Sequence, residues 1–334
     1  MNVVDLFCGC GGLSTGFHNN KNFNIIVAND IWADAMETYR ANFPQTKTIL
    51  GSLCDDVIKQ EIITLAQKKC DLIIGGPPCQ AYSMAGARDP NDPRAKLFED
   101  YLALVKALNP KYCIMENVKG ILSATYESGK PALKLKKQPT VPPPVKLKLK
   151  IKVIDKITAE FQKLNYHVSY KVLNSADYGV PQKRERLILI ASRMDVPVVS
   201  HPAPSHIGRW VSVRTAIDDL KSRPEDESFS HILTKHSPEV IQKIGQTAFG
   251  QSMNPKYKEA FYKCPPDEPS LTVKENHGGV FLHYERLSVM TPRELARLQS
   301  FPDTFKFKGT KSSILKQIGN AVPVKLGIAI SDIF

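Results

Sequence analysis

The sequence has no apolar run near the roughly 20 residues that cross a bilayer, so we expect no membrane-spanning segment. It lacks a secretory leader, because the apolar pair Val3 and Val4 is followed at once by Asp5. Its seven cysteines have no zinc-site spacing: Cys8 and Cys10 are separated by one residue, and no second Cys/His pair follows at a suitable interval. These absences predict a chain of a reducing compartment, without membrane, metal or disulfide framework.

The charge is strongly unbalanced, with a formal net charge of +12 and a pI near 9.2. Such a balance favours a polyanionic partner, nucleic acid above all. Between Glu127 and Lys156, nine lysines and two acidic residues give one stretch +7 and leave +5 for the remainder. The chain has 334 residues, 42% of them hydrophobic, which is enough for one large domain and a smaller one.

Strands and helices are predicted to alternate through the first half of the chain. Strand-like runs cover residues 2–7, 23–28, 46–50, 71–74 and 112–115, and helical segments cover 13–19, 31–43, 55–67 and 95–108. This alternation is typical of an α/β domain with a mostly parallel sheet, which binds its ligands along the carboxyl edge of the strands.

A glycine-rich turn over residues 8–12 connects the first strand to the first helix and favours a small ligand there. It is not the dinucleotide fingerprint, because Ser14 stands where that motif has its third glycine. Asp30 ends the second strand about 20 residues later, where a carboxylate can bond ribose hydroxyls. The alternatives are an ordinary glycine turn and, for Asp30, a helix N-cap.

A stiff turn at residues 75–80, Gly-Gly-Pro-Pro-Cys-Gln, follows the fourth strand. The prolines fix φ and the glycines permit an unusual backbone path, which is how a nucleophile such as Cys79 would be presented. The alternative is a proline turn with a small buried cysteine. Glu116 follows the fifth strand at the same sheet edge. Arg184 and Arg186 precede a later strand, where they could clamp an oxygen-bearing ligand or form a charged strand edge.

Residues 129–145 are rich in Lys and Pro, which indicates an insertion. The following stretch, 145–153, alternates lysine with apolar residues. An edge strand with lysines in water is favoured over a ribbon that grips phosphates. A helix should then bury Ile154, Ile157 and Phe161 on one face together with Leu164.

Two more strands are expected at 166–173 and 187–191, after which the alternation stops and a second domain with weak periodicity begins near residue 194. Thr291, Pro292 and Glu294 form a capping-box pattern with proline at the first helical position. The apolar C-terminal helix, which ends near Phe334, should pack on the first domain.

Five segments stand in the order and spacing of one family. They are Asp-Leu-Phe-Cys-Gly-Cys-Gly-Gly at 5–12, Pro-Pro-Cys-Gln at 77–80, Glu-Asn-Val at 116–118, Gln-x-Arg-x-Arg at 182–186 and Gly-Asn-Ala-Val-Pro at 319–323. On these segments the sequence resembles the DNA (cytosine-5) methyltransferases of bacterial restriction-modification systems. The resemblance implies a Rossmann-like catalytic domain over 1–193 and 314–334, with an insertion at about 127–150, and a smaller irregular target-recognition domain over 194–313.

The resemblance implies methyl transfer from S-adenosylmethionine to C5 of a flipped-out cytosine in a specific short duplex sequence. Cys79 would add to C6 of the base, which turns C5 into a nucleophilic enamine carbon. Glu116 would protonate or hydrogen-bond N3, and Arg186 would hold the O2 side. Arg184 or Arg186 would help to lower the pKa of the thiol.

For the cofactor, the resemblance places Phe7, Gly9 and Gly11 on the methionine part, Asp30 on the ribose and Ile31 on the adenine. It adds to the same site Gly12, Ser52, Pro77, Leu97, Asn320 and Val322. The family usually has Gly-Asp at the end of the third strand, whereas this chain has Gly51-Ser52. Either Ser52 or one of the carboxylates of Asp55 and Asp56 is therefore expected to contact the adenine amino group.

The implied partner is double-stranded DNA, bound by a monomer in a bacterial cytoplasm at the nucleoid, with a restriction endonuclease of the same specificity as a candidate companion. Unranked DNA contacts in the second domain are Arg209, Trp210, Arg214, Lys235, Lys243, Lys256, Lys258 and Lys274. One alternative is a tRNA cytosine-5 methyltransferase, whose usual Cys-Phe-Thr tripeptide is absent because Cys264 precedes two prolines. Another is a catalytically inactive DNA-binding regulator, which would usually lack the nucleophile.

Overall fold

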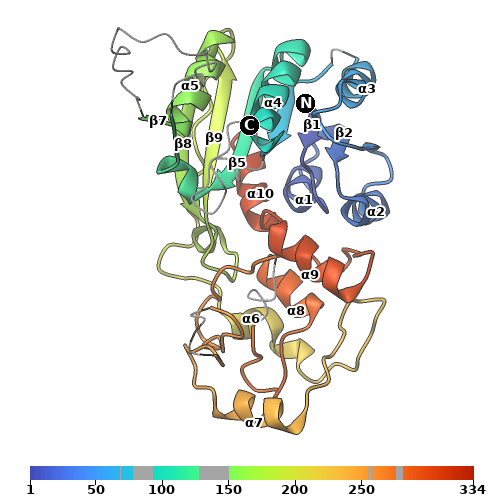
Figure 1. Ribbon diagram of the computed structural model, residues 1–334, viewed down its shortest axis with the longest axis vertical. Coiled ribbons are helices and arrows are strands. Elements are labelled where there is room, and N and C mark those ends of the chain that lie inside the picture. Colours follow the sequence, from blue (N-terminus) through green and yellow to red (C-terminus); the bar gives the residue numbers. More distant parts are fainter. Residues whose placement is uncertain (68, 78–92, 128–149, 255, 257–258, 276–280) are drawn as a thin grey trace, which may run out of the picture.

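The computed structural model describes residues 1–67, 69–77, 93–127, 150–254, 256, 259–275 and 281–334. Two bodies are stacked along the longest axis of the molecule (Figure 1). The larger body, called the α/β region below, contains both chain termini. The smaller body, called the second region, is entered by the chain after residue 193.

A seven-stranded sheet forms the middle layer of the α/β region. Its order is β3-β2-β1-β4-β5-β9-β8, with bounds Lys47–Leu50, Asn24–Asp30, Asn2–Leu6, Leu72–Gly75, Tyr112–Val118, Glu185–Arg193 and Tyr166–Asn174. The strands from β3 to β5 in this order pair in parallel, whereas β9 runs antiparallel to both of its neighbours. The expected α/β class with a mostly parallel sheet is confirmed.

Helices cover both faces of the sheet, because successive strand residues point into two different apolar layers. The helices of this region are α1 (Gly12–His18), α2 (Ala33–Asn42), α3 (Asp56–Ala66), α4 (Pro93–Leu108), α5 (Val153–Lys163) and α10 (Val324–Ser331). On one face, α3, α4 and α5 bury side chains such as Tyr101 and Phe161 against the sheet. On the other face, α1 and α10 do the same with Phe17 and Ile330.

Several element boundaries differ from the sequence expectations. The fifth strand runs on to Val118, so Glu116 lies inside β5 and not after it. Helix α2 begins at Ala33 with Trp32 as its capping residue, so the N-cap interpretation of Asp30 is wrong. The chain needs two further residues after β2 before it turns into the helix. Helix α4 starts at Pro93, two residues earlier than expected, because proline is tolerated in a first turn.

The lysine-rich stretch is described only at its end. β7 (Lys150–Lys152) pairs antiparallel with β6 (Thr125–Glu127) as a separate two-stranded sheet. Residues 128–149, which include most of the insertion and two of the four alternating lysines, lie outside the described residues. The expected strand is too long at its other end, because Val153 already begins α5. The amphipathic face predicted for that helix is confirmed, since Ile154, Ile157 and Phe161 are all buried.

The second region is built from short elements joined by isolated bridges. They are α6 (Val213–Ile217), a 3-10 turn at Asp218–Leu220, α7 (Pro238–Gln246), α8 (Pro292–Leu298) and α9 (Lys311–Asn320). The predicted capping box at the start of α8 is present. An apolar cluster combines Met36 and Tyr39 of α2 with Leu295 and Ile318 of the second region, so the two bodies share a core. The boundary expected at residue 314 falls inside α9.

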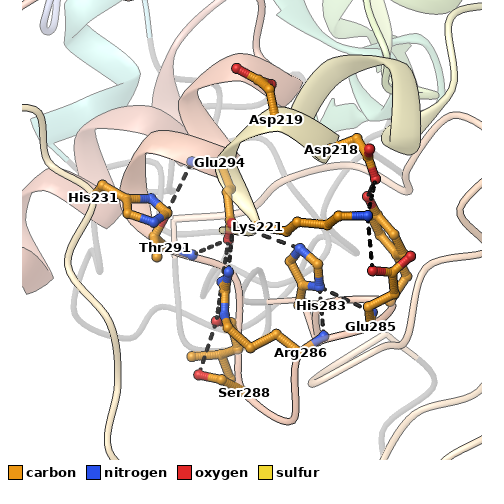
Figure 2. A network of polar contacts seen from close by, with 12 residues as sticks. Asp218, Asp219, Lys221, His231, His283, Glu285, Arg286, Ser288, Thr291 and Glu294 are labelled. Atoms are coloured by element: carbon orange, nitrogen blue, oxygen red, sulfur yellow. Dashed lines mark hydrogen bonds and ion pairs between the residues drawn. The ribbon is translucent and has the colours of Figure 1, made fainter. Parts of the chain in front are cut away.

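Buried charges join short segments of the second region and act in addition to its apolar cluster (Figure 2). The Glu294 carboxylate is fully buried and accepts two hydrogen bonds from the Arg286 guanidinium, at 3.0 and 2.7 Å, and a third from the Thr291 backbone N–H. Nδ1 of the buried His283 accepts from two backbone N–H groups, which assigns its proton to Nε2. Burial lowers the pKa of His283 to about 4, so the ring is neutral at pH 7.

The C-terminal helix packs on the first domain, as the sequence predicted, and the contact depends on two glycines. A Cβ on Gly16 of α1 would lie 2.3 Å from the carbonyl carbon of Gly327 in α10. The two helices therefore meet backbone to backbone, and any side chain at Gly16 would force them apart.

We predict that Gly16→Ala lowers the free energy of unfolding by about 1–3 kcal/mol, the usual cost of overpacking a core contact. The matched control is Gly245→Ala in α7, where a Cβ would meet only ordinary contact at 3.6 Å. That change should leave stability unchanged or raise it by up to about 1 kcal/mol, because alanine favours helix. Urea unfolding of both variants measures the difference. An equal loss of unfolding free energy in the two variants would contradict the close packing of α1 on α10.

Candidate active site

The carboxyl ends of three neighbouring strands crowd together at the centre of the sheet. β4 lies between β1 and β5, and its last residues pass between the backbones of both. A Cβ on Gly75 would lie 1.8 Å from the Leu6 carbonyl oxygen, and one on Gly76 would lie 2.0 Å from that of Glu116. Gly75 also has a φ of +126°, which other residues rarely adopt. The glycines of the turn are therefore required by its path.

The turn that follows is tied to β5. The Asn117 side-chain amide donates a 3.0 Å hydrogen bond to the carbonyl oxygen of the buried Pro77. Cys79 itself, and the loop predicted at 81–94 as far as residue 92, lie outside the described residues. What the structure does place is the chain up to Pro77, which is fixed beside the strand that carries Glu116.

Glu116 and Arg186 form an ion pair at this edge of the sheet. Arg186 Nε lies 2.8 Å from Glu116 Oε1, and both side chains are mostly buried. The antiparallel register of β5 and β9 brings them together, because Arg186 stands opposite Val118, two residues beyond Glu116. An open hollow of about 530 Å³ lies beside Arg186, with Lys119 and Lys183 also on its wall.

Arg184 has a different place from Arg186. Its two Nη atoms donate to the carbonyl oxygens of Val273, at 2.8 Å, and Gly319, at 3.1 Å. Burial, and then the nearby charge of Arg186, lower the pKa of Arg184 to about 9. Arg184 thus joins the backbone segments of Val273 and Gly319 and takes no part in the ion pair of Glu116 with Arg186. The expected clamp of two arginines on one ligand is not formed.

The glycine-rich turn has an open side. Phe7, Gly9 and Gly11 all have positive φ, and a Cβ on Gly9 would meet no atom within 4 Å. The Gly9 backbone N–H donates a 2.8 Å hydrogen bond to Asp30 Oδ2, while Oδ1 accepts from the Trp32 N–H. Burial raises the pKa of Asp30, and these bonds oppose the shift. The structure therefore brings Asp30 against the turn, next to free space that a ligand can fill.

The residues expected to contact the adenine follow the ends of β2 and β3. Ile31 is 70% exposed, unusual for so apolar a side chain, and offers a flat surface to a ring. Ser52 Oγ accepts only from the Cys54 N–H in the described structure and keeps its own proton as a donor. Asp55 caps α3 and Asp56 pairs with Lys59. Both carboxylates are thus engaged at the helix start, which leaves Ser52 as the better-placed contact of the three.

The C-terminal segment returns to the same turn. A Cβ on Gly12 would lie 2.4 Å from the carbonyl oxygen of Val322, so the two backbones touch. Asn320 is exposed at the end of α9, just before this contact. Leu97 instead lies on α4 and packs half-buried against the apolar layer of the sheet.

Sequence reasoning missed several residues that build the site. Asp5 is buried beneath the glycine turn, accepts a hydrogen bond from Ser14, and burial raises its pKa to about 7. A carboxylate inside an otherwise apolar strand was the available signal. Gln182 binds Gln299 at 2.9 Å and accepts from the Val273 N–H, which joins β9 to the C-terminal segment. Nothing in the sequence pairs these two glutamines.

Some of the candidate DNA contacts already have a partner within the chain, whereas others do not. Arg214 pairs with Asp267 and Glu285, and Lys274 pairs with Glu259. Lys258 lies outside the described residues. Trp210 donates to Asp177 and lies under the Lys183 ammonium. Of the candidate DNA contacts, Arg209, Lys235, Lys243 and Lys256 have no ion pair within the described part of the chain.

Two absences hold for the described residues. No helix among them is long and apolar enough to cross a membrane. No group of three His, Cys, Asp or Glu side chains within them could hold a metal ion.

A parallel sheet with a glycine turn after β1, an acidic residue at the end of β2 and a ligand edge shared by β4 and β5 defines a Rossmann-like methyltransferase fold. Solved structures share it. A prophage-encoded E. coli protein, described as a candidate DNA modification methyltransferase, matches with a TM-score of 0.76 and 24% identity, covering 99% of this chain and 97% of that one. The S. pombe Dnmt2 methyltransferase matches with a TM-score of 0.69 and 19% identity, covering 100% and 98%.

The family model of the C-5 cytosine-specific DNA methylases matches residues 1–332, so the chain belongs to that family and is a DNA cytosine-5 methyltransferase. The type II methyltransferase M1.HphI of Haemophilus parahaemolyticus is 35% identical over 350 residues, which cover 99% of this chain and 86% of that relative. M.DdeI of Desulfomicrobium norvegicum is 30% identical over 390 residues, covering 99% and 88%. The family resemblance noted in the sequence is confirmed.

Proposed function

We propose that the protein methylates C5 of a flipped-out cytosine in a specific short duplex DNA sequence, with Cys79 as a covalent nucleophile. The observation that carries the proposal is the bond from Asn117 to Pro77. It ties the chain leading to Cys79 to the strand that bears the Glu116–Arg186 pair. A nucleophile, an acid and a cation would then meet at one point of the sheet edge.

The chemistry needs these three groups together. C5 of cytosine is a poor nucleophile until a thiolate adds at C6, and the addition places negative charge on the N3 and O2 side of the ring. Glu116 would bond or protonate N3, and Arg186 would hold O2. Loss of the C5 proton would then expel the Cys79 thiolate and restore the aromatic ring.

The ion pair explains how the base can be received. N3 and O2 are neighbouring atoms of cytosine, and the carboxylate and guanidinium that would hold them are neighbours at 2.8 Å. The contact also holds the two side chains in position beside each other. A flipped base would insert its polar edge between Glu116 and Arg186. The ion pair would then be replaced by one contact from each side chain to the substrate. The cost of flipping, a few kcal/mol, is met in part there.

The methyl donor is proposed to be S-adenosylmethionine, which supplies an electrophilic methyl group when bound. The residues fit it, because Gly9 borders open space and Asp30 stands beside it with a carboxylate suited to ribose hydroxyls. Phe7, Gly11, Gly12, Asn320 and Val322 would complete the methionine side. The exposed Ile31 and the half-buried Ser52 would serve the adenine, and Pro77 would border the reacting end.

The type II relatives support a role in restriction and modification. We infer that the second region reads the target sequence, that the enzyme acts as a monomer, and that an endonuclease of the same specificity accompanies it. Arg209, Lys235, Lys243 and Lys256 are the first candidates for phosphate contacts, because their charges are not already paired within the described structure.

Transfer of a labelled methyl group tests the function directly. Purified protein is incubated with labelled S-adenosylmethionine and either duplex DNA or tRNA, and bisulfite sequencing then locates the modified cytosines. Label in duplex DNA alone, at one recurrent short sequence, is expected. Label in tRNA alone would show the RNA enzyme, and DNA binding without any transfer would show an inactive regulator.

Two substitutions should separate the chemical step from cofactor binding. Glu116→Gln keeps the shape but cannot give up a proton, so kcat should fall about 100-fold or more with little change in the affinity for S-adenosylmethionine. Asp30→Ala removes a ribose contact and should mainly raise KM for the cofactor. Steady-state kinetics with both substrates measures the split. An unchanged kcat in the first variant would assign the acid to another residue.

A further inference from the structure

An apolar cavity in the second region is separate from the site described above. It measures about 380 Å³, within the range of small-molecule pockets, and eight of its eleven lining residues are apolar. Val240 and Ile244 of α7 form one wall, and Leu315 of α9 forms another. In Figure 1, α7 is the element of the second region farthest from the sheet, so the cavity lies away from the Glu116–Arg186 pair.

The third wall is held open by the buried charges of Figure 2. Leu282, Val289 and Met290 line the cavity from a tight backbone turn, in which Met290 N–H bonds the Phe281 carbonyl at 2.7 Å. The Arg286–Glu294 pair fixes that turn to α8. A wall anchored in this way resists collapse into the space, and water in the apolar part of the cavity would find few polar partners. Filling the cavity with an apolar molecule is therefore favourable.

The polar residues of the lining select for an anion. Lys311 donates to the Leu233 carbonyl, at 3.0 Å, and to Thr234 Oγ1, at 2.7 Å, which uses two of the three N–H groups of its ammonium. Within the described residues it has no ion pair, although the charge of Glu225 acts on it from farther away. No carboxylate is among the described residues that line the cavity. A positive charge thus stands at an otherwise apolar wall.

His236 adds a second donor. Its Nε2 accepts from the Val289 backbone N–H at 3.4 Å, so the neutral ring carries its proton on Nδ1. Burial, and then the charge of Lys311, lower the pKa of His236, which keeps the ring neutral. The polar part of the cavity therefore combines a cation with an N–H donor, the complement of a carboxylate.

From this geometry we infer that the cavity between α7, α9 and the turn of Leu282 to Met290 is a binding site for a small carboxylic acid with an apolar body. The carboxylate would bond Lys311 and His236, and the apolar part would fill the space beside Val240, Ile244 and Leu315. The site is independent of the proposed methyl-transfer roles, because none of those residues lines it.

Methionine NMR tests the site without an activity assay. Met253 and Met290 line the cavity, whereas Met36 and Met115 are buried outside its lining and report on folding. Protein labelled with ¹³C at its methionine methyls is titrated with naphthalene-2-carboxylate and, separately, with the neutral naphthalene-2-carboxamide. The carboxylate should shift the two cavity signals only, and should bind about tenfold or more tightly than the amide, the usual advantage of a charge-assisted hydrogen bond.

Three variants decide the outcome. Lys311→Met should abolish the preference for the carboxylate, whereas Lys235→Met, an exposed lysine outside the lining, should retain it. Val240→Phe fills the space and should weaken both probes about tenfold, with the Met36 and Met115 signals unmoved. Cavity signals that stay still up to the solubility limit of the carboxylate would refute the site. Equal affinity for the two probes in the parent protein would refute its anionic specificity.

Discussion

The close approach of three strand ends is the constraint on which the rest of the site depends. Gly75 and Gly76 let β4 pass between the carbonyl oxygens of Leu6 and Glu116 with no room for a side chain. Because β1 carries the glycine turn and β5 carries Glu116, this crowding sets the proposed methyl-donor site and the proposed base site on either flank of one turn. Any widening of the sheet there would separate the two halves of the chemistry.

The second constraint is the return of the chain from the second region. Arg184 and Gln299 donate to backbone carbonyls on the segments around Val273 and Gly319, and so fix the C-terminal segment against β9. Gln182 supports the same contact by accepting from the Val273 backbone N–H. The next residues of the C-terminal segment touch Gly12. The second region also depends on buried ion pairs such as Arg286–Glu294, which specify one arrangement of the short irregular segments around its apolar cluster.

The alternation of apolar runs predicted the order of the α/β elements, and the glycine and proline turn predicted where a nucleophile would stand. The contacts between side chains of different strands could not be predicted from the sequence. The contact of Glu116 with Arg186 depends on the register of antiparallel β5 and β9, which no local pattern contains. The different environments of Arg184 and Arg186 depend on segments about 90 and 135 residues away. Asp30 seemed suited to an N-cap because propensity cannot place a helix start to the residue.

Trapping with 5-fluorocytosine tests the central claim, covalent methyl transfer through Cys79, most directly. Fluorine at C5 leaves no proton to remove after methyl transfer, so the thiolate cannot be expelled. With duplex DNA that carries this base at the target, the account predicts a complex that survives denaturation, requires S-adenosylmethionine, maps to Cys79 by peptide mass and is absent from Cys79→Ser. Complete turnover without a stable complex, or an adduct on another residue, would contradict it.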